Sequence, residues 1–314
     1  MYLALAQTNV GANLFASCPP SAATNRQQTC SSKSVERGFT LVELIMVIAL
    51  AGIVAVMIST VMSRPLQGFA DQSRRAELTD LAAMALNRMA RDIRLAVPNS
   101  VKNEEGCLPG SCRTLEFLQI SGAGRYKGNQ LPHGVERFDP PRCPDSGACF
   151  IPVLSPSLDI EKAKWMVIYN TNKEVWLPPD SAGQAVITPS KAEVRFGDCP
   201  QGDDYGLKCL ELKEAGEFSF KSPSPAHRFY LSDGAIRYRC GADGSGAYKL
   251  YRAVSEDLKA YSGESTVVDS VTHCSLTYET STNTRNGLVT LHLSLTKGGE
   301  TVSLLQQVHV DNAP

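Results

Sequence analysis

The longest uninterrupted apolar stretch of the chain covers Phe39–Met62 and contains a single charged residue, Glu43. A helix of these 24 residues is about 36 Å long, which is enough to cross the hydrocarbon core of a bilayer with some tilt. Buried helices of soluble proteins are rarely apolar on all sides over such a length, so the pattern favours a membrane span over a core helix. Lys33 and Arg37 precede the span, and the positive-inside rule therefore places residues 1–38 in the cytoplasm.

A second helical pattern follows the span and extends from Pro65 to about Val97, where Pro98-Asn99-Ser100 ends it. We predict that Pro65 breaks or kinks the helix near the membrane, because proline lacks the N–H and crowds the preceding turn. The apolar positions recur in steps of three and four, at Leu78, Leu81, Ala85, Met89, Ile93 and Val97. The opposite face carries Arg74, Arg75, Asp80, Arg88, Arg91 and Arg94, with Asp71–Arg75 and Arg88–Asp92 at supporting i,i+4 spacing. We interpret this face as solvated, with a binding surface as the alternative.

The remainder of the chain has the shorter alternation of β-strands, so we predict an α+β fold with a helix packed on an antiparallel sheet. A C-terminal hairpin is the clearest element, with Leu288–Thr296 and Thr301–Val310 joined at Lys297-Gly298-Gly299-Glu300. Val289, Leu291, Leu293 and Leu295 are expected to face one side of it. The segments Ser121–Ile151 and Phe196–Glu217 are expected to be long loops. The other candidate strands are Thr114–Ile120, Trp165–Tyr169, Ala185–Thr188, Glu217–Phe220, Arg228–Leu231, Ile236–Arg239, Tyr248–Arg252 and Cys274–Tyr278.

The composition bounds the class of protein. The chain has 314 residues, 43% of them hydrophobic, with 31 basic and 32 acidic side chains. These values fit one medium-sized domain or two small ones, and they exclude a disordered, collagen-like or multi-span membrane protein. The formal net charge of -1 gives no basic field, so a nucleic-acid partner is not expected.

Ten cysteines are too many for a reduced cytosolic protein without a metal-site pattern, and they indicate an oxidising compartment. Cys18 and Cys30 precede the span, which leaves eight beyond it. Eight cysteines permit 105 pairings, so only proximity in the sequence favours one set over the others. That set is Cys107–Cys112, Cys143–Cys149, Cys199–Cys209 and Cys240–Cys274.

Signatures of catalysis or metal binding are weak. None of the cysteines forms a Cys-x-x-Cys pair, and the five histidines (133, 227, 273, 292 and 309) are scattered. The run Gly241–Gly246 is expected to be a turn between two strands. Asp203-Asp204 is expected to be solvated, with a calcium site as the alternative. We therefore expect no enzymatic activity, no cofactor and no metal.

The junction Arg37-Gly38-Phe39-Thr40-Leu41-Val42-Glu43 is distinctive because it places a charge inside the span. Such a charge costs a few kcal/mol and usually marks function. If the chain were cut after Gly38, Phe39 would carry a new amine, and Glu43 could neutralise the amine of a neighbouring subunit within an apolar helical bundle. A secretory signal peptide would instead be cut after the apolar run, where no Ala-x-Ala pattern occurs.

Gly38, Phe39, Glu43 and the apolar helix beyond them resemble the class III signal of type IV pilins and pseudopilins. The resemblance implies cleavage between Gly38 and Phe39 by a prepilin peptidase, methylation of the new amine, and a type IV pilin-like fold with disulfide-bonded loops in its head. It also implies a single-pass inner-membrane protein with a cytoplasmic N-terminus and a periplasmic head. The leader is longer than usual, so we expect the true start near Val35. The expected parts are residues 1–38 (leader), 39–62 (span, in contact with lipid and later with the fibre), 63–97 (amphipathic continuation) and 98–314 (head).

Several patches extend the likeness to the MshO family of minor pilins of the MSHA (mannose-sensitive haemagglutinin) pilus. They are Pro65–Asp71, Arg74–Ala76, Arg88–Arg94, Pro98–Ser100, Arg228–Leu231, Tyr238–Cys240, Gly287–Leu291 and Val302–Pro314. The likeness implies a low-abundance subunit that primes or caps an extracellular pilus with major and minor pilins, through an inner-membrane assembly platform. Two alternatives remain open: a J-type pseudopilin of type II secretion, and a tip adhesin on which Trp165, Trp176 and Tyr126 stack sugars.

Overall fold

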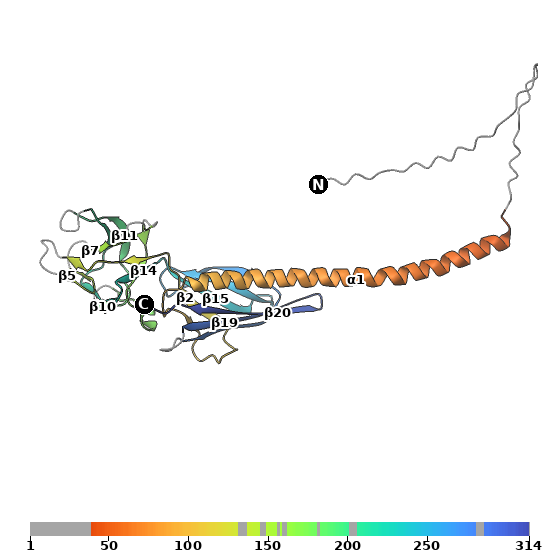
Figure 1. Ribbon diagram of the computed structural model, residues 1–314. Helices are drawn as coiled ribbons and strands as arrows, with labels where there is room; N and C mark the ends of the chain where they lie inside the picture. Colours follow the sequence, from red (N-terminus) through yellow and green to blue (C-terminus); the bar gives the residue numbers. More distant parts are fainter. Residues whose placement is uncertain are drawn as a thin grey trace, which may run out of the picture. The chain divides into compact units, whose positions relative to one another are not determined.

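The computed structural model describes residues 39–130, 137–144, 149–155, 158, 162–180, 183–200, 206–280 and 286–313 (Figure 1). For residues 62–67, 129–130, 137 and 162 it describes the backbone alone. The chain divides into two compact units after Val61, one containing the apolar span and the other, Met62–Pro314, containing the head.

The helix α1 (Leu41–Arg94) contains 54 residues and continues through Pro65. The prediction of a break at this proline is therefore wrong. Its fixed φ is close to the helical value and its missing N–H removes one hydrogen bond, while the turns on both sides remain helical. The helix ends three residues earlier than predicted, where the N–H groups of Leu95 and Ala96 donate to carbonyls three residues back and tighten the last turn before Pro98.

The predicted apolar face of α1 is confirmed within the head. Leu81 is only partly covered, while five of the six predicted positions are buried: Leu78, Ala85, Met89, Ile93 and Val97. Ala82, Leu86 and Ala90 widen this face. This apolar face follows the 3.6-residue period of a helix, and through it α1 packs against two sheets.

The two i,i+4 charge pairs expected on α1 are replaced by other pairs. Asp71 lies 3.4 Å from Arg74, and Asp92 lies 3.0 Å from Nε of Arg252 on the facing sheet. The same carboxylate accepts a 2.8 Å hydrogen bond from the hydroxyl of Tyr238. Burial raises the pKa of Tyr238, and the neighbouring carboxylate raises it further, so the phenol stays a donor. Asp92 thus links the helix to the sheet.

We expect Asp92→Ala to lower the free energy of unfolding by about 2 kcal/mol, because the Arg252 guanidinium would lose its carboxylate in a site where both side chains are under one-fifth exposed. Urea unfolding of the detergent-solubilised chain, followed by tryptophan fluorescence, measures the change. Asp80→Ala, at an exposed position on the same helix, is the control and should stay within about 0.5 kcal/mol of the original. Equal effects of the two substitutions would contradict this role.

The first layer of the head consists of a five-stranded and a three-stranded antiparallel sheet that share one core with α1 (Figure 1). Asn103 lies between them, since its Nδ2 donates to the carbonyls of Thr114 and Leu276. The five-stranded sheet contains β1 (Lys102–Asn103), β2 (Thr114–Leu118), β15 (Ala235–Ala242), β16 (Tyr248–Ser255) and β17 (Ser262–Val268), in that order. The three-stranded sheet contains β18 (Val271–Glu279), β19 (Gly287–Lys297) and β20 (Glu300–Val310).

The predicted C-terminal hairpin is confirmed as β19 and β20. Lys297 pairs with Glu300 across a two-residue turn, and Gly298 and Gly299 have φ angles of 60° and 88°. A type I′ turn requires positive φ at both positions, which is why two glycines occur here. The four residues expected on one face are buried: Val289, Leu291, Leu293 and Leu295.

A second lobe of small sheets replaces the two long loops that the sequence predicted, so that prediction is wrong. Its sheets have the orders β7–β12–β11–β8, β3–β14–β9, β10–β13–β6 and β4–β5, and the β10–β13 pair is parallel. The α+β class is confirmed, but the head is not built on a single sheet. The strands are β3 (Gly122–Arg125), β4 (Asn129–Gln130), β5 (Arg137–Phe138), β6 (Arg142–Cys143), β7 (Cys149–Val153), β8 (Lys162–Ala163), β9 (Trp165–Val167), β10 (Gly183–Ala185), β11 (Glu193–Asp198), β12 (Lys208–Lys213), β13 (Phe218–Phe220) and β14 (Arg228–Ser232), with one 3₁₀ turn, η1 (Lys173–Trp176).

Candidate processing and assembly site

The start of α1 is fixed by a side chain of the junction itself. Phe39 and Thr40 are not helical, and the N–H of Glu43 donates to Oγ1 of Thr40 at 3.2 Å. The N–H of Leu44 donates to the carbonyl of Thr40, also at 3.2 Å. Thr40 is thus the N-cap of the helix, and Thr-x-x-Glu is the sequence of a capping box. Sequence reasoning gave Thr40 no role, although this pattern before an apolar run was available as a signal.

The expected cleavage point lies directly before this cap. Gly38 is outside the described residues, and Phe39 is 79% exposed ahead of the first helical residue, Leu41. An exposed, non-helical Phe39 suits entry into a peptidase, because no helix has to unwind on this side of the bond.

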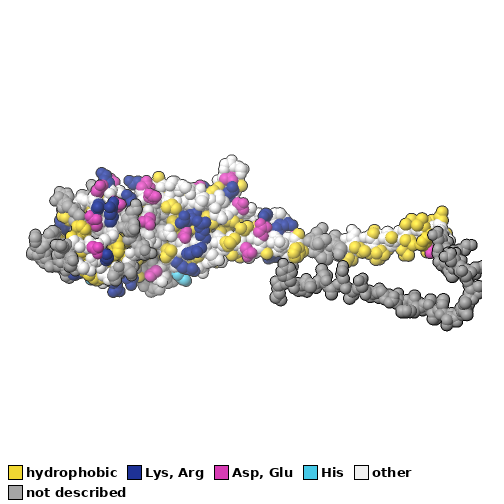
Figure 2. Space-filling view, turned by 90° about the horizontal axis from the view of Figure 1, so that it is seen from above, with side chains coloured by type: hydrophobic (Ala, Val, Ile, Leu, Met, Phe, Trp, Pro, Cys, Tyr) yellow, Lys and Arg dark blue, Asp and Glu magenta, His cyan; other side chains and the backbone are white. Residues whose placement is uncertain are grey.

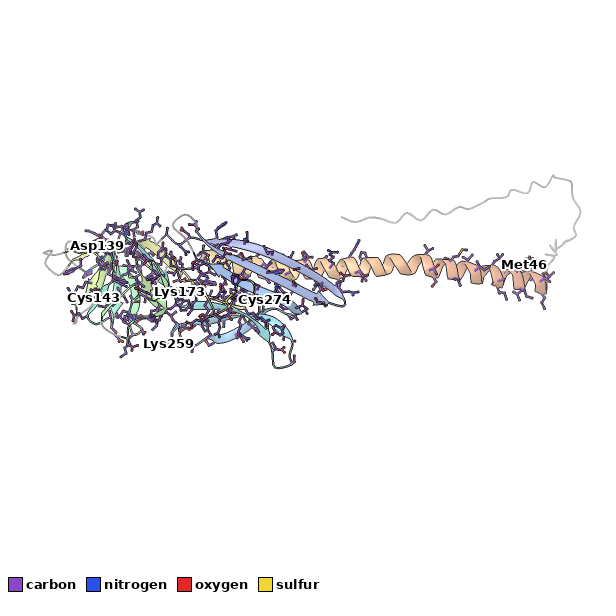
Figure 3. The ribbon with its side chains drawn as sticks, turned by 90° about the horizontal axis from the view of Figure 1, so that it is seen from below. Met46, Asp139, Cys143, Lys173, Lys259 and Cys274 are labelled. Carbon is purple, nitrogen blue, oxygen red and sulfur yellow. A yellow bond between two sulfur atoms is a disulfide. The ribbon has the colours of Figure 1, made fainter. Side chains whose placement is uncertain are left out.

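The span itself is apolar on every side. Leu41–Val61 is long enough to cross a membrane, at about 1.5 Å per residue, and none of it is buried by the described part of the chain. Figure 2 shows hydrophobic side chains on the visible face of this part of the helix, and Figure 3 shows the side chain of Met46 pointing away from it. Such a surface requires lipid or the apolar helices of other subunits around it.

Glu43 places one carboxylate in this apolar surface, four residues after Phe39. Burial of a carboxylate among apolar groups is costly unless a cation or several donors accompany it. A cut after Gly38 would create such a cation, the amine of Phe39, on every processed subunit. After such a cut, each span would carry one anion and one cation near the same end.

Comparison with known proteins agrees with this geometry. Residues 33–59 match the protein family described as the prokaryotic N-terminal methylation motif. The match covers the junction and most of the span, and it ends before the head. Searches of curated proteins and of solved structures found no match.

These observations support one class of protein. The methylation motif supports a type IV pilin or pseudopilin, which suggests a structural protein. The motif implies processing by a prepilin peptidase and assembly with other pilins. Together with the apolar helix, it fits a single-pass anchor in the inner membrane.

Eight cysteines of the head are joined in four disulfides, and Figure 3 labels Cys143 and Cys274. Cys240–Cys274 links β15 to β18 and so ties together the two sheets beneath α1. Cys143–Cys149 and Cys199–Cys209 brace the second lobe, while Cys107–Cys112 closes the segment before β2. The spacing of the cysteines favours the same four pairs. Their oxidation in the cell remains a prediction, which an intact mass tests.

The other candidate sites in the head are a metal-binding cluster, Asp203-Asp204 and the run Gly241–Gly246. Across the described ranges, no group of three or more His, Cys, Asp or Glu side chains is placed to hold a metal ion. Asp203-Asp204 lies outside those ranges. The run Gly241–Gly246 is the expected turn, between β15 and β16, where Asp243 accepts hydrogen bonds from the N–H groups of Ser245 and Ala247.

The three aromatic residues named in the adhesin alternative do not form an exposed platform. Trp165 and Tyr126 are fully buried. The indole N–H of Trp176 donates to the carbonyl of Ser100, and Nζ of Lys102 lies 3.7 Å from the centre of its ring. Burial excludes sugar stacking on Trp165 and Tyr126, and Lys102 occupies one face of the partly buried Trp176 ring.

One polar cluster of the second lobe was missed by sequence reasoning. The hydroxyl of Tyr126 donates to Oδ1 of Asp139 at 2.9 Å, and Nε2 of His227 lies 2.9 Å from Oδ2 of the same carboxylate (Asp139 is labelled in Figure 3). Burial raises the pKa of Tyr126, so its phenol remains a hydrogen-bond donor. The cluster ties the residue after β3 and the residue before β14 to the segment between β5 and β6, and its members are too far apart in sequence to form a motif.

Proposed function

We propose that the protein is a minor pilin of an MSHA-type type IV pilus, cut between Gly38 and Phe39 and placed at the tip of the fibre to prime assembly. The observation that carries the proposal is the junction, where an exposed Phe39 precedes a capped helix that bears one carboxylate in a bare apolar surface. The general class follows from the methylation motif. The finer assignment rests on the sequence patches shared with the MshO family.

In the assembly step, the apolar span moves from lipid into contact with the helices of other subunits. In the membrane, lipid covers Leu41–Val61, and in the fibre the helices of neighbouring subunits replace it. Glu43 then pairs with the amine of Phe39 on an adjacent subunit, so that neither charge is left alone in an apolar surrounding. The assembly platform and the other pilins are the partners of this step.

The size of the head supports the tip position. Residues 98–314 form two lobes with separate cores and four disulfides, whereas a subunit that repeats along a thin shaft must pack closely against copies of itself. A type IV pilin-like fold, with the long helix packed on the sheets, is part of the same proposal.

Immunogold labelling of sheared pili, together with deletion of the gene, tests this function. We expect label at fibre ends and at least tenfold fewer pili in the deletion strain, restored by the intact gene. Label spaced evenly along the shafts would contradict the tip position. Normal piliation with a loss of protein secretion would contradict the pilus role and identify a type II secretion pseudopilin instead, since both classes carry the same motif.

A further inference from the structure

The last strand of the chain has one edge without a hydrogen-bonding partner. β20 pairs with β19 over its whole length, and no strand in the described ranges pairs with its other side. The blue strands of this sheet lie along α1 in Figures 1 and 3. An 11-residue edge is long, and its free N–H and C=O groups are a template for another strand.

The turn before β20 determines which residues of β20 direct their backbone N–H and C=O groups away from β19. In a type I′ hairpin the residues flanking the turn, Lys297 and Glu300, exchange hydrogen bonds, and the ladder then alternates. Even-numbered residues of β20 therefore bond to β19, and odd-numbered residues direct their N–H and C=O groups away from it. We call these odd-numbered residues the β20 edge: Thr301, Ser303, Leu305, Gln307 and His309. All five side chains are exposed.

The β20 edge lacks the features that normally prevent edge pairing. β20 contains no lysine, arginine or proline, and its register with β19 has no bulge. By contrast, β17 at the edge of the five-stranded sheet has two register irregularities and contains Gly263 and Glu264, the latter paired with Arg239. One sheet of the head thus has a blunted edge and the other an open one.

Apolar side chains line the margin between the β20 edge and α1. Gln306 contacts Asn87 at 3.5 Å, which places this part of α1 beside β20. Met84, one helical turn before Asn87, is 61% exposed, and Leu81 and Leu304 are only partly covered. A strand added beside β20 would direct every second side chain over this margin, so apolar residues suit those positions.

The direction of the chain argues against a second copy as the occupant. Glu77 pairs with Lys297 and Asn87 contacts Gln306, so α1 and β20 run in the same direction within the head. Antiparallel self-pairing of β20 would make the two α1 helices run in opposite directions. Parallel self-pairing would need a two-fold axis along the strands, so either kind of self-pairing relates the two copies by a two-fold axis. Subunits that add in turn to a fibre are instead related head to tail, without such an axis, so the fibre of the proposed function does not place one β20 edge against another.

We propose that the β20 edge receives an extended strand from a different subunit of the pilin class, with apolar side chains directed at Leu81, Met84 and Leu304. The partner's class rests on the proposed function. The added strand would extend the three-stranded sheet beside α1, so main-chain hydrogen bonds supply affinity and the apolar margin supplies selectivity.

In-cell photo-crosslinking tests the proposal on the full chain in bacteria that assemble the fibre. A photo-reactive residue replaces Gln307 on the β20 edge or, as the matched control, Thr266 on the exposed side of β17. We expect an adduct from position 307 only, joined to a subunit that carries its own prepilin motif and mapped by mass spectrometry to one of its strands. The variant Leu305→Pro removes one outward donor without touching the ladder to β19, and should lower the adduct yield at least tenfold.

Leu305→Lys is the second blocking variant and Leu305→Thr the control that preserves strand propensity. Both should retain the thermal midpoint of the original chain, so a lower yield with lysine reports a blocked edge and not unfolding. A yield at position 307 no higher than at 266, an adduct with a second copy, or insensitivity to Leu305→Lys would each overturn the proposal.

Processing and fibre incorporation are measured in the same cells. A cleaved, incorporated chain without the adduct defeats the edge proposal alone, whereas an uncleaved chain defeats the proposed function and the edge proposal with it.

Discussion

Replacing Glu43 by glutamine is expected to leave the protein in the inner membrane, cleaved at its normal site, but to reduce its incorporation into fibres about 100-fold. The carboxylate is the one charge within the apolar span, and glutamine keeps its shape without its charge. The amine of an adjacent Phe39 would then lie unpaired among apolar helices, at a cost of about 3 kcal/mol, which corresponds to a factor of about 100. Immunoblots of sheared fibres and of membranes measure the ratio.

Thr40→Ala is the matched control for this substitution, because it removes the helix cap while retaining the carboxylate. Loss of an N-cap costs about 1 kcal/mol, and Leu41–Val61 remains helical in lipid, so incorporation should fall less than tenfold. Normal incorporation of the Glu43→Gln chain, or an equal loss with Thr40→Ala, would show that the charge itself has no role in assembly.

Loss of the Cys240–Cys274 disulfide is expected to lower the free energy of unfolding of the head by about 3–4 kcal/mol. The bond closes a 34-residue interval and joins β15 to β18. Without it, the unfolded chain gains conformational entropy, which lowers the free energy of unfolding. The double variant Cys240→Ser, Cys274→Ser avoids a leftover thiol. Urea unfolding followed by fluorescence suits the measurement, because Trp165 and Trp176 both lie in the head.

The Cys107–Cys112 disulfide provides the internal comparison. It closes an interval of only five residues, and the same chain-entropy relation gives about 2 kcal/mol for the corresponding double serine variant. The loss with Cys240 and Cys274 should therefore be the larger of the two. A smaller loss with that pair would show that α1 and Asn103 already hold the sheets together without the covalent link.

The parts of the fold with a clear periodicity were predictable from the sequence. The apolar face of α1 repeats over several turns, and Val289, Leu291, Leu293 and Leu295 alternate without a break before a diglycine turn. Only part of the second lobe was predictable: β9, β13 and β14 coincide with predicted strands, whereas the strands within the two segments expected to be loops contain two to six residues and are too short to show a period. In β12, Cys209 and Leu210 are adjacent and both buried, so even its alternation is broken.

The functional residues also differ in how far the sequence alone reveals them. The charge at Glu43 stands out because the surrounding residues are apolar, and the motif around Gly38 and Phe39 is local in sequence. By contrast, Asp92 finds its partners on β15 and β16, about 150 residues away, and no helical spacing reveals them. The burial of Trp165 and Tyr126 likewise depends on tertiary packing, which composition cannot show.

The N-terminal sequence and intact mass of the membrane-extracted protein test the central claim most directly, in cells with and without prepilin peptidase. The account predicts an N-methylated Phe39 in the peptidase-positive cells and an uncut chain in the others. It also predicts a mass eight hydrogens below the fully reduced value, from four disulfides. A chain that keeps the residues before Phe39 when the peptidase is present would make the helix an ordinary membrane anchor, and the assembly role of Glu43 would be lost with it.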